Sequence, residues 1–394
     1  MISSESRVLV GEYHDLEVAL DKIVKRIRDR GRRYRSVAGV LSRLKRKFNL
    51  GITDGEAKGE MMEDRLVFEV EADPLSDGAV MGVDGGVLNR SMHGLDLILV
   101  RAVAVAFRYR NGRLSSFDYH PSALPTPQLI CVDQLLDSRE LELMTGIQRQ
   151  LIELRVAREA LKEHEVDVLL LDGSVLPQYL DKAPRSPQLR DLYGKLIEAF
   201  LGLYEDCEGL GVILAGAVKD SRGSRCLNIL RQKVLPPLAE KGVLSQEDLK
   251  VLSDNDEVFS SSCDTAFLNY LLSVGERSFA IKCTDSSGKV LGDLGKWARH
   301  AYTFYVKTVP FDFPIRVEFM DTSGEVSRIA DRLASLVYAL SGDHSSCAIP
   351  TVLIEADARA RLAEEELAII ADDIISRLEP FAPMELRRRR GPFQ

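Results

Sequence analysis

The sequence lacks any hydrophobic run that approaches the roughly 20 residues needed to span a bilayer. Its N-terminal stretch has neither the basic start nor the cleavage site of a signal peptide. The six cysteines show no CxxC spacing, which argues against a zinc knuckle and against a disulfide framework. We therefore expect a soluble, cytoplasmic protein that has no membrane partner and keeps its cysteines as thiols in the core.

Internal repeats and low-complexity linkers are also absent from the sequence. The 394 residues are 45% hydrophobic, which is enough to fill a substantial core. A basic, helix-forming segment stands at the start, and a polar connector rich in Gly and Glu follows it. The sequence thus predicts a helical arm and connector over residues 1–60 and one elaborated domain over residues 61–394.

A net charge of -8 would ordinarily argue against a nucleic-acid partner, but the basic residues are concentrated in two blocks. A dozen lie between Lys22 and Lys47 against Asp29 alone, and Arg387 to Arg390 are four consecutive arginines. Such blocks attract phosphates, although each could equally be a solvated helix face or a frayed tail. The candidate DNA-binding residues on the arm are Arg26, Arg28, Arg30, Arg32 and Arg33.

The predicted elements begin with one or two helices over residues 14–48, with a break at Gly31. β-rich runs and helical periodicities then alternate. The strands are predicted over 77–86, 94–110, 112–120, 166–173 and 211–220, and the helices between them over 138–164 and 186–207. Asn111-Gly112 is a strong hairpin signal. This order is that of the α/β ribonuclease H-like fold, a mixed sheet flanked by helices. A single long helix is predicted over 356–378.

Asp84 and Asp172 each follow a hydrophobic strand and precede a glycine. In a ribonuclease H-like sheet the first and fourth strands are neighbours, so the two carboxylates should meet at one edge. Neighbouring carboxylates repel one another unless a cation neutralises them, and oxygen ligands suit Mn²⁺ or Mg²⁺. Two such ions can activate water for phosphodiester hydrolysis. Asp-Gly also commonly ends a strand at a simple turn.

A third carboxylate, Glu153, lies on the helix before the second Asp-Gly strand. It shares a face with Ala157 and Ala160, whose small side chains would let the helix approach the sheet closely. Glu153 could therefore reach the two aspartates, although on its own it could also be a surface charge.

Six short motifs occur together in order: GVDGG, ELRVA, LLLDGS, AVKDS, GERS and IPTVLIEAD. In order and approximate spacing they resemble the NurA nuclease family, from about residue 78 to residue 370. The resemblance implies a ribonuclease H-like core, a ring-shaped homodimer, and manganese-dependent 5′-to-3′ exonuclease and single-strand endonuclease activity on DNA. It also implies partnership with the hexameric HerA translocase ATPase in DNA end processing and repair.

Carried over position by position, the family's metal ligands fall on Asp84, Glu153 and Asp172. The lysine of its KDS motif falls on Lys219. A cation there could hold a DNA phosphate or stabilise developing charge, or Lys219 could simply end a strand.

The last motif departs from the family pattern, because Ile349 replaces a tyrosine and Asp357 replaces a histidine. In one interpretation Asp357 completes an all-carboxylate ligand set that suits Mg²⁺ as well as Mn²⁺. In the other, the site has decayed and the protein is a DNA-clamping or regulatory subunit of the ATPase. His344 could also substitute for the missing histidine. A further alternative is an actin-like ATPase, although no second glycine-rich loop follows Gly86.

Overall fold

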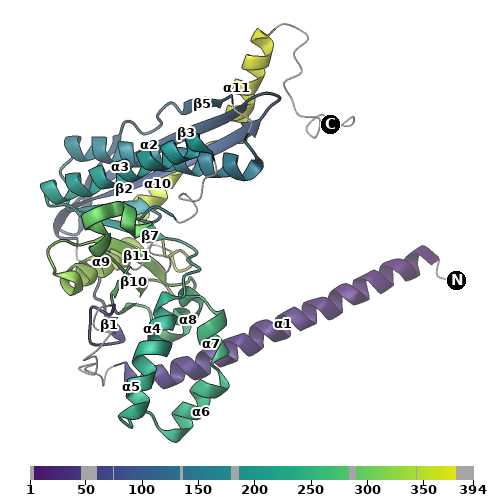
Figure 1. Cartoon of the computed structure of the whole chain (residues 1–394), viewed down its shortest axis with the longest axis vertical. Coiled ribbons are helices and arrows are strands. Elements are labelled where there is room, and N and C mark those ends of the chain that lie inside the picture. The colour runs from purple at the N-terminus through teal and green to yellow at the C-terminus, as the bar shows by residue number, and fades with distance from the viewer. Residues whose placement is uncertain are drawn as a thin grey trace.

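The computed structural model describes residues 4–45, 60–73, 75–133, 136–178, 186–283, 290–342 and 344–378, without the side chains of residues 4–15. Within them, one mixed sheet of 11 strands forms the centre of the molecule, in the order β1-β8-β10-β11-β7-β6-β2-β3-β4 (Figure 1). β5 pairs with β3, and β9 pairs with β10. The strands are β1 Val67–Glu69, β2 Asp77–Ser91, β3 Asp96–Arg110, β4 Arg113–His120, β5 Gln128–Val132, β6 Val168–Asp172, β7 Ile213–Val218, β8 Glu276–Ser278, β9 Ile281–Lys282, β10 Ala301–Lys307 and β11 Ile315–Met320.

The helices lie between and around these strands. They are α1 Ser4–Leu44, α2 Ser138–Glu163, α3 Pro187–Leu210, α4 Arg225–Ile229, α5 Leu235–Glu240, α6 Gln246–Asp254, α7 Glu257–Ser261, α8 Asp264–Leu271, α9 Val326–Leu340, α10 Thr351–Ala360 and α11 Glu364–Arg377. A π-helical turn η3 covers Leu230–Val234, and a kinked 3₁₀ segment η4 covers Leu291–Arg299.

Strands β4, β3, β2, β6 and β7 reproduce the ribonuclease H-like arrangement, so the predicted fold class is confirmed. β2, β3 and β4 form an antiparallel meander, whereas β2 and β6 are parallel, as are β6 and β7. The turn between β3 and β4 is made by Asn111 and Gly112, both with positive φ, of 51° and 71°. These are the backbone angles that favour Asn-Gly in a two-residue hairpin.

Helices cover both faces of this part of the sheet. Along β2 the side chains alternate, so Met81 and Val83 join the core under α2 and α3, while Val80 joins the core under α9 and α10. Gly82 lies against Val352 of α10, where a Cβ atom would come within 2.8 Å of the carbonyl oxygen. The strand tips are thus held between two helical layers.

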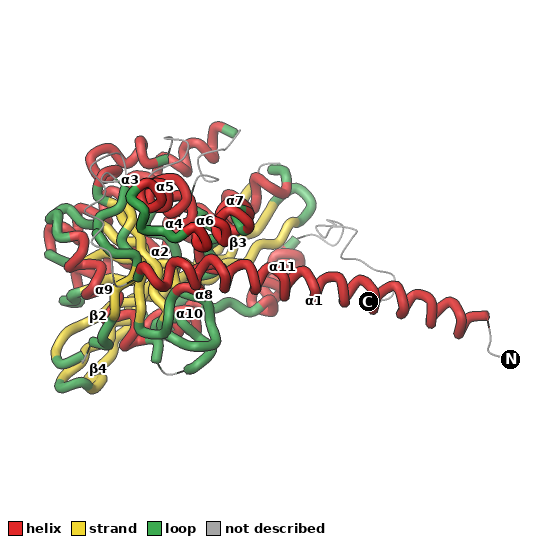
Figure 2. Tube along the Cα trace, turned by 90° about the horizontal axis from the view of Figure 1, so that it is seen from below, coloured by secondary structure: helices red, strands yellow, loops and turns green. Residues whose placement is uncertain are grey.

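Helix α1 is continuous from Ser4 to Leu44, so the predicted break at Gly31 is wrong. Gly31 lies under the Tyr270 hydroxyl, and Tyr34, three residues later, packs its ring on Phe267 and Tyr270 of the α4–α8 group. Glycine is compatible with a helix where packing favours it. The N-terminal part of α1 projects away from the rest of the protein (Figure 1, Figure 2).

The C-terminal part of α1 is packed into a second core with the α4–α8 group, where Val37 and Leu41 are fully buried. The predicted division at residue 60 stays a prediction, because residues 46–59 lie outside the described part of the chain. The arginine block Arg387 to Arg390 also lies outside it.

The long helix predicted over 356–378 is wrong, because the structure has α10 and α11 with a break at Arg361. Arg361 is extended, with ψ 134°. The buried Arg101 guanidinium donates a hydrogen bond to the Arg361 carbonyl at 2.9 Å and another to the Glu366 carboxylate at 2.6 Å. Because Arg101 lies on β3, the break depends on a residue distant in the sequence.

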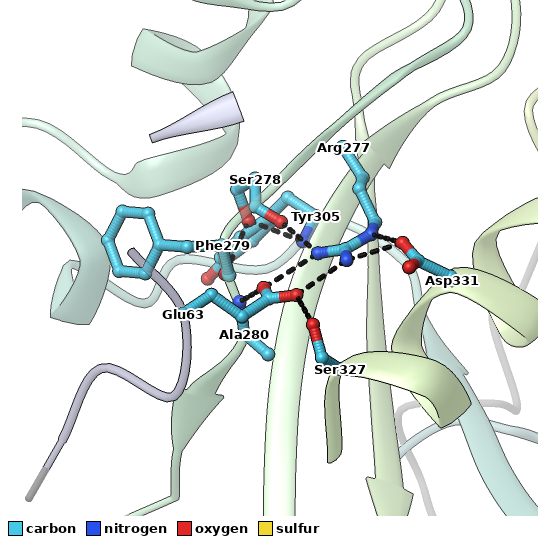
Figure 3. A network of polar contacts seen from close by, with 8 residues as sticks. All are labelled: Glu63, Arg277, Ser278, Phe279, Ala280, Tyr305, Ser327 and Asp331. Carbon is cyan, nitrogen blue, oxygen red and sulfur yellow. Dashed lines mark hydrogen bonds and ion pairs between the residues drawn. The ribbon is translucent and has the colours of Figure 1, made fainter. Parts of the chain in front are cut away.

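A buried arginine ties the residues after the connector to the sheet (Figure 3). Arg277 of β8 donates two hydrogen bonds to Glu63, at 2.8 and 2.6 Å, and others to Asp331 of α9. The Glu63 side chain is only 2% exposed. Glu63 also accepts a hydrogen bond from the Ala280 backbone N–H at 2.6 Å, so all of its buried charge is compensated.

None of the described helices has a stretch long and apolar enough to cross a membrane. The predicted cytoplasmic location stays a prediction.

Candidate metal centre

Asp84 and Asp172 meet at the carboxyl ends of two parallel strands. The last pair in the β2–β6 register is Val83 with Leu171, so each aspartate is the next residue along its strand. Alternation along the strands puts both on the face covered by α10. Asp84 is buried, and its Oδ1 accepts a hydrogen bond from the Gly85 N–H at 2.7 Å. The predicted juxtaposition of the two aspartates is confirmed.

Glu153 reaches this edge from α2, on the opposite face of the sheet. A Cβ atom on Gly85 would lie 2.6 Å from Glu153 Oε1 and 2.7 Å from its Cγ, so only glycine fits beneath this side chain. Ala157 and Ala160, on the same side of α2, are fully buried. The predicted close approach of α2 through small residues is confirmed.

The second glycine of the DGG motif lies against the opposite helical layer. A Cβ atom on Gly86 would lie 2.3 Å from the carbonyl oxygen of Ala360, at the end of α10. Asp357 lies one turn earlier on the same helix, with 44% of its side chain exposed. The helix packs against β2, and the charge of Asp357 makes a small contribution to raising the pKa of Asp84.

The electrostatics of the site reflect burial and crowding of negative charge. Burial, followed by the charge of Asp172, raises the pKa of Asp84 to about 7, although Lys219 opposes the shift. Burial also raises the pKa of Glu153 to about 8, opposed by Arg149 and reinforced by Asp84 and Asp172. Near neutral pH a cation therefore has to displace protons from these two buried carboxyl groups.

Three of the four carboxylates have a basic partner within the chain. Lys219 forms an ion pair with Asp172 at 2.5 Å, and Arg149 lies 3.2 Å from Glu153. Arg361 pairs with Asp357 at 2.9 Å. Sequence reasoning missed both arginines, although each stands four residues from its carboxylate, the spacing that brings side chains together on a helix.

The donor set fits a divalent cation, but its oxygens are not yet gathered around one point. Among the described residues, no three His, Cys, Asp or Glu side chains are already arranged to hold a metal ion. Glu153 Oε1 is nevertheless buried without a hydrogen-bond partner. That oxygen lies 3.2 Å from Arg149 Nη1 without forming a hydrogen bond with it, so beside other carboxylates it is suited to a hard cation such as Mn²⁺ or Mg²⁺.

Two other predicted residues have simple placements. Lys219 follows β7 directly and its ammonium group points to Asp172. His344 lies in the loop before α10, where Nδ1 contacts the Ser346 hydroxyl at 2.9 Å. No contact in the described part of the chain links His344 to the carboxylates.

The candidate DNA-binding arginines lie on α1, and all five are exposed. Arg33 forms an ion pair with Glu257 of α7, and Arg32 lies 3.7 Å from Asp29. The described residues provide no ion pair for Arg26, Arg28 or Arg30. Their role in DNA binding stays a prediction.

Comparison with known proteins supplies further evidence. The family described as NurA domain matches residues 78–362. The crystal structure of the NurA nuclease from Sulfolobus solfataricus is similar, with a TM-score of 0.56 and 14% sequence identity, covering 94% of this chain and 99% of that chain. A NurA structure bound to dAMP and manganese has a TM-score of 0.45 and 11% identity, covering 97% of this chain and 99% of that chain. No curated protein matches the chain significantly.

Proposed function

Because the chain belongs to the NurA family, we propose that it is a divalent-metal-dependent DNA nuclease that hydrolyses phosphodiester bonds in DNA end processing. One observation carries this proposal: Asp84 and Asp172 adjoin at the tips of β2 and β6, with Glu153 brought to the same edge by Gly85. Three separate elements bring these acidic groups together although they repel one another, and a bound cation would offset that repulsion.

In this proposal Asp84, Glu153, Asp172 and Asp357 hold Mn²⁺ or Mg²⁺. When bound, the cation lowers the pKa of water and stabilises charge on the leaving oxygen. Lys219 lies next to Asp172 and is 35% exposed, so it can turn from the carboxylate to a DNA phosphate. It would hold the strand and stabilise charge that develops on the phosphate.

Family membership also supports the finer proposals: 5′-to-3′ exonuclease and single-strand endonuclease activity on single- and double-stranded DNA, and partnership with a HerA-type hexameric ATPase. One observation favours the second candidate function, a catalytically degenerate DNA-clamping or regulatory subunit. Glu153, Asp172 and Asp357 each already have a basic partner within the chain. A chain that had lost its metal would need such partners.

A nuclease assay separates the two candidates. End-labelled single-stranded and duplex DNA would be incubated with the protein and Mn²⁺, Mg²⁺ or EDTA, with and without the ATPase. We expect cleavage with either cation, none with EDTA, and none for Asp84→Asn or Asp172→Asn, because asparagine keeps the shape but loses the charge that holds the cation. Asp77→Asn is the matched control, since Asp77 is an exposed aspartate at the opposite end of β2.

Cleavage that survives in both site variants would refute the proposed site. A wild-type protein that binds DNA and never cuts it would favour the regulatory subunit.

The projecting part of α1 supports a proposed homodimer. Leu16, Leu20, Ile23 and Ile27 are exposed and follow one another at intervals of four, three and four residues. This is the spacing of a coiled-coil seam, so we propose that α1 packs against a second copy of the chain. Light scattering should give twice the chain mass for the wild type, and Leu20→Glu with Ile27→Glu should yield a folded monomer. A wild-type monomer would refute this assembly.

A further inference from the structure

A pocket adjoins the carboxylate cluster on the side of Lys219. It has a volume of about 550 Å³ and lies between the end of β7, the loop before β11 and the segment leading into α10. This volume falls within the range of about 300–1,000 Å³ that is common for small-ligand sites. Its lining is mixed: Val218, Ile315, Ala348 and Ile349 are apolar, Asp220 and Asp312 are acidic, and Ser221 and Thr265 are polar.

Two cationic residues line the same pocket. Lys219 belongs both to the pocket and to the ion pair with Asp172, so it links the pocket to the candidate metal centre. Arg222, three residues later, is exposed, and no ion pair or hydrogen bond joins its guanidinium to the described residues. A phosphate that approaches the carboxylate cluster from this side would meet both cations.

An aromatic side chain completes the pocket. Phe313 lines it and is 55% exposed, while Phe311, two residues earlier, is 78% exposed. The loop is held in place, because Asp312 accepts hydrogen bonds from the backbone N–H groups of Phe313 at 2.7 Å and Ala348 at 2.8 Å. Packing does not explain why large rings stand in solvent on a fixed loop. A fixed, exposed ring is suited to stacking against a planar ligand.

From this arrangement we propose that the pocket is a nucleotide subsite, in which Phe313 stacks on a base of single-stranded DNA next to the phosphate held by Lys219. Arg222 contacts the adjoining phosphate. Stacking on an aromatic ring is tolerant of sequence, because every base has a π face. The subsite would therefore let the enzyme hold an unpaired strand without reading it. The inference rests on the proposed nuclease function and adds how the substrate is held.

Fluorescence anisotropy with a labelled oligo(dT) in EDTA tests the proposal, because binding is then measured without cleavage. We expect Phe313→Ala to weaken binding by about ten- to a hundredfold, the range that loss of one base–aromatic stack produces. Phe313→Tyr should bind like the wild type, because it keeps the ring. Phe117→Ala is the matched control, since Phe117 is 54% exposed on β4, at the far edge of the sheet.

A second probe distinguishes stacking from a general loss of structure. An oligonucleotide that is abasic throughout should bind the wild type and Phe313→Ala equally, because neither complex contains the stack. Arg222→Ala should lower the magnitude of the salt slope for oligo(dT) by about 0.7, the value for one phosphate contact on a single strand.

Each outcome has a defined meaning. If Phe313→Ala binds oligo(dT) normally while the wild type cuts DNA, the subsite is refuted and the nuclease function stands. An equal loss with the abasic strand also refutes stacking. If the wild type neither binds nor cuts any DNA, the proposed function fails and the subsite fails with it.

Discussion

Gly85→Ala is predicted to displace Glu153 and so to damage the candidate metal centre without touching a charged group. The added methyl carbon would lie 2.6 Å from Glu153 Oε1, 2.7 Å from Cγ and 3.1 Å from Cδ. Glu153 cannot swing into solvent, because its carboxylate is buried between Gly85 and Arg149. Overpacking of this kind costs about 1–3 kcal/mol of unfolding free energy. The Glu153 carboxylate should also leave the metal position, so we expect at least a tenfold loss of Mn²⁺ affinity.

Gly146→Ala is the matched control, because there the same substitution should raise the unfolding free energy instead of lowering it. Gly146 lies on α2 with Glu153, and a Cβ atom built on it meets nothing within 4 Å. Alanine in an open helical position should therefore stabilise the protein by about 0.5–1 kcal/mol. Urea unfolding measures both variants, and titration calorimetry measures Mn²⁺ binding.

A double-mutant cycle with Glu153→Ala isolates the contact. Once the Glu153 side chain is removed, the new methyl group has nothing to displace, so Gly85→Ala should cost almost nothing in that background. The coupling energy should equal the cost of the single variant, about 1–3 kcal/mol. If Gly85→Ala is equally destabilising with and without Glu153, the strain lies elsewhere and the close packing of Gly85 on Glu153 is not the cause.

Three further predictions concern pH, the arm and the buried arginine. The pKa of Asp84 is raised to about 7 and that of Glu153 to about 8 in the metal-free native state. Between these values and about pH 4 the native state therefore keeps protons that the unfolded chain has lost. The unfolding free energy of the metal-free protein should consequently fall as the pH rises from about 4 to about 8. Mn²⁺ affinity should rise up to about pH 8, by up to about tenfold per pH unit for each proton released, and a flat calorimetric profile would refute this. Replacing Arg26, Arg28 and Arg30 by glutamine should weaken duplex binding and reduce the salt slope by up to about 0.9 per lost phosphate contact; an unchanged slope would assign the arm to structure. Arg277→Met should lower the unfolding free energy measured in urea by about 3–5 kcal/mol, because it leaves Glu63 buried and unpaired. Adding Glu63→Gln to that variant should recover much of the lost unfolding free energy.

The sequence could predict the edge of the fold that carries the candidate metal centre because its signals are local. Asn111-Gly112 sets the hairpin by its turn chemistry, and the order of strands and helices identifies the topology that makes β2 and β6 neighbours. Once that topology is known, Asp84 and Asp172 must adjoin. The alanines at 157 and 160 likewise indicate which face of α2 meets the sheet.

Features that depend on contacts between distant residues could not be predicted in this way. The break between α10 and α11 requires Arg101, which lies 260 residues before the carbonyl that it binds. Helical periodicity continues through that break, so the pattern alone favoured one helix. The continuity of α1 through Gly31 depends on rings from α8 in the same manner.

The sequence motifs do not indicate that the carboxylates have basic partners, which a cation would have to displace. Negative charge is concentrated where the fold brings together Asp84, Asp172, Glu153 and Asp357. The metal-free chain offsets this charge in part with three basic side chains, Lys219, Arg149 and Arg361. It also keeps Asp84 and Glu153 partly protonated near neutral pH. Capture of a cation would then be an exchange, in which protons leave and ion pairs open. Arg149 stands on α2 and Arg361 directly follows α10, each four residues from its carboxylate, and both can turn to solvent. Lys219 lines the pocket together with Arg222, so in this proposal the same event would free an ammonium group where a DNA phosphate has to bind.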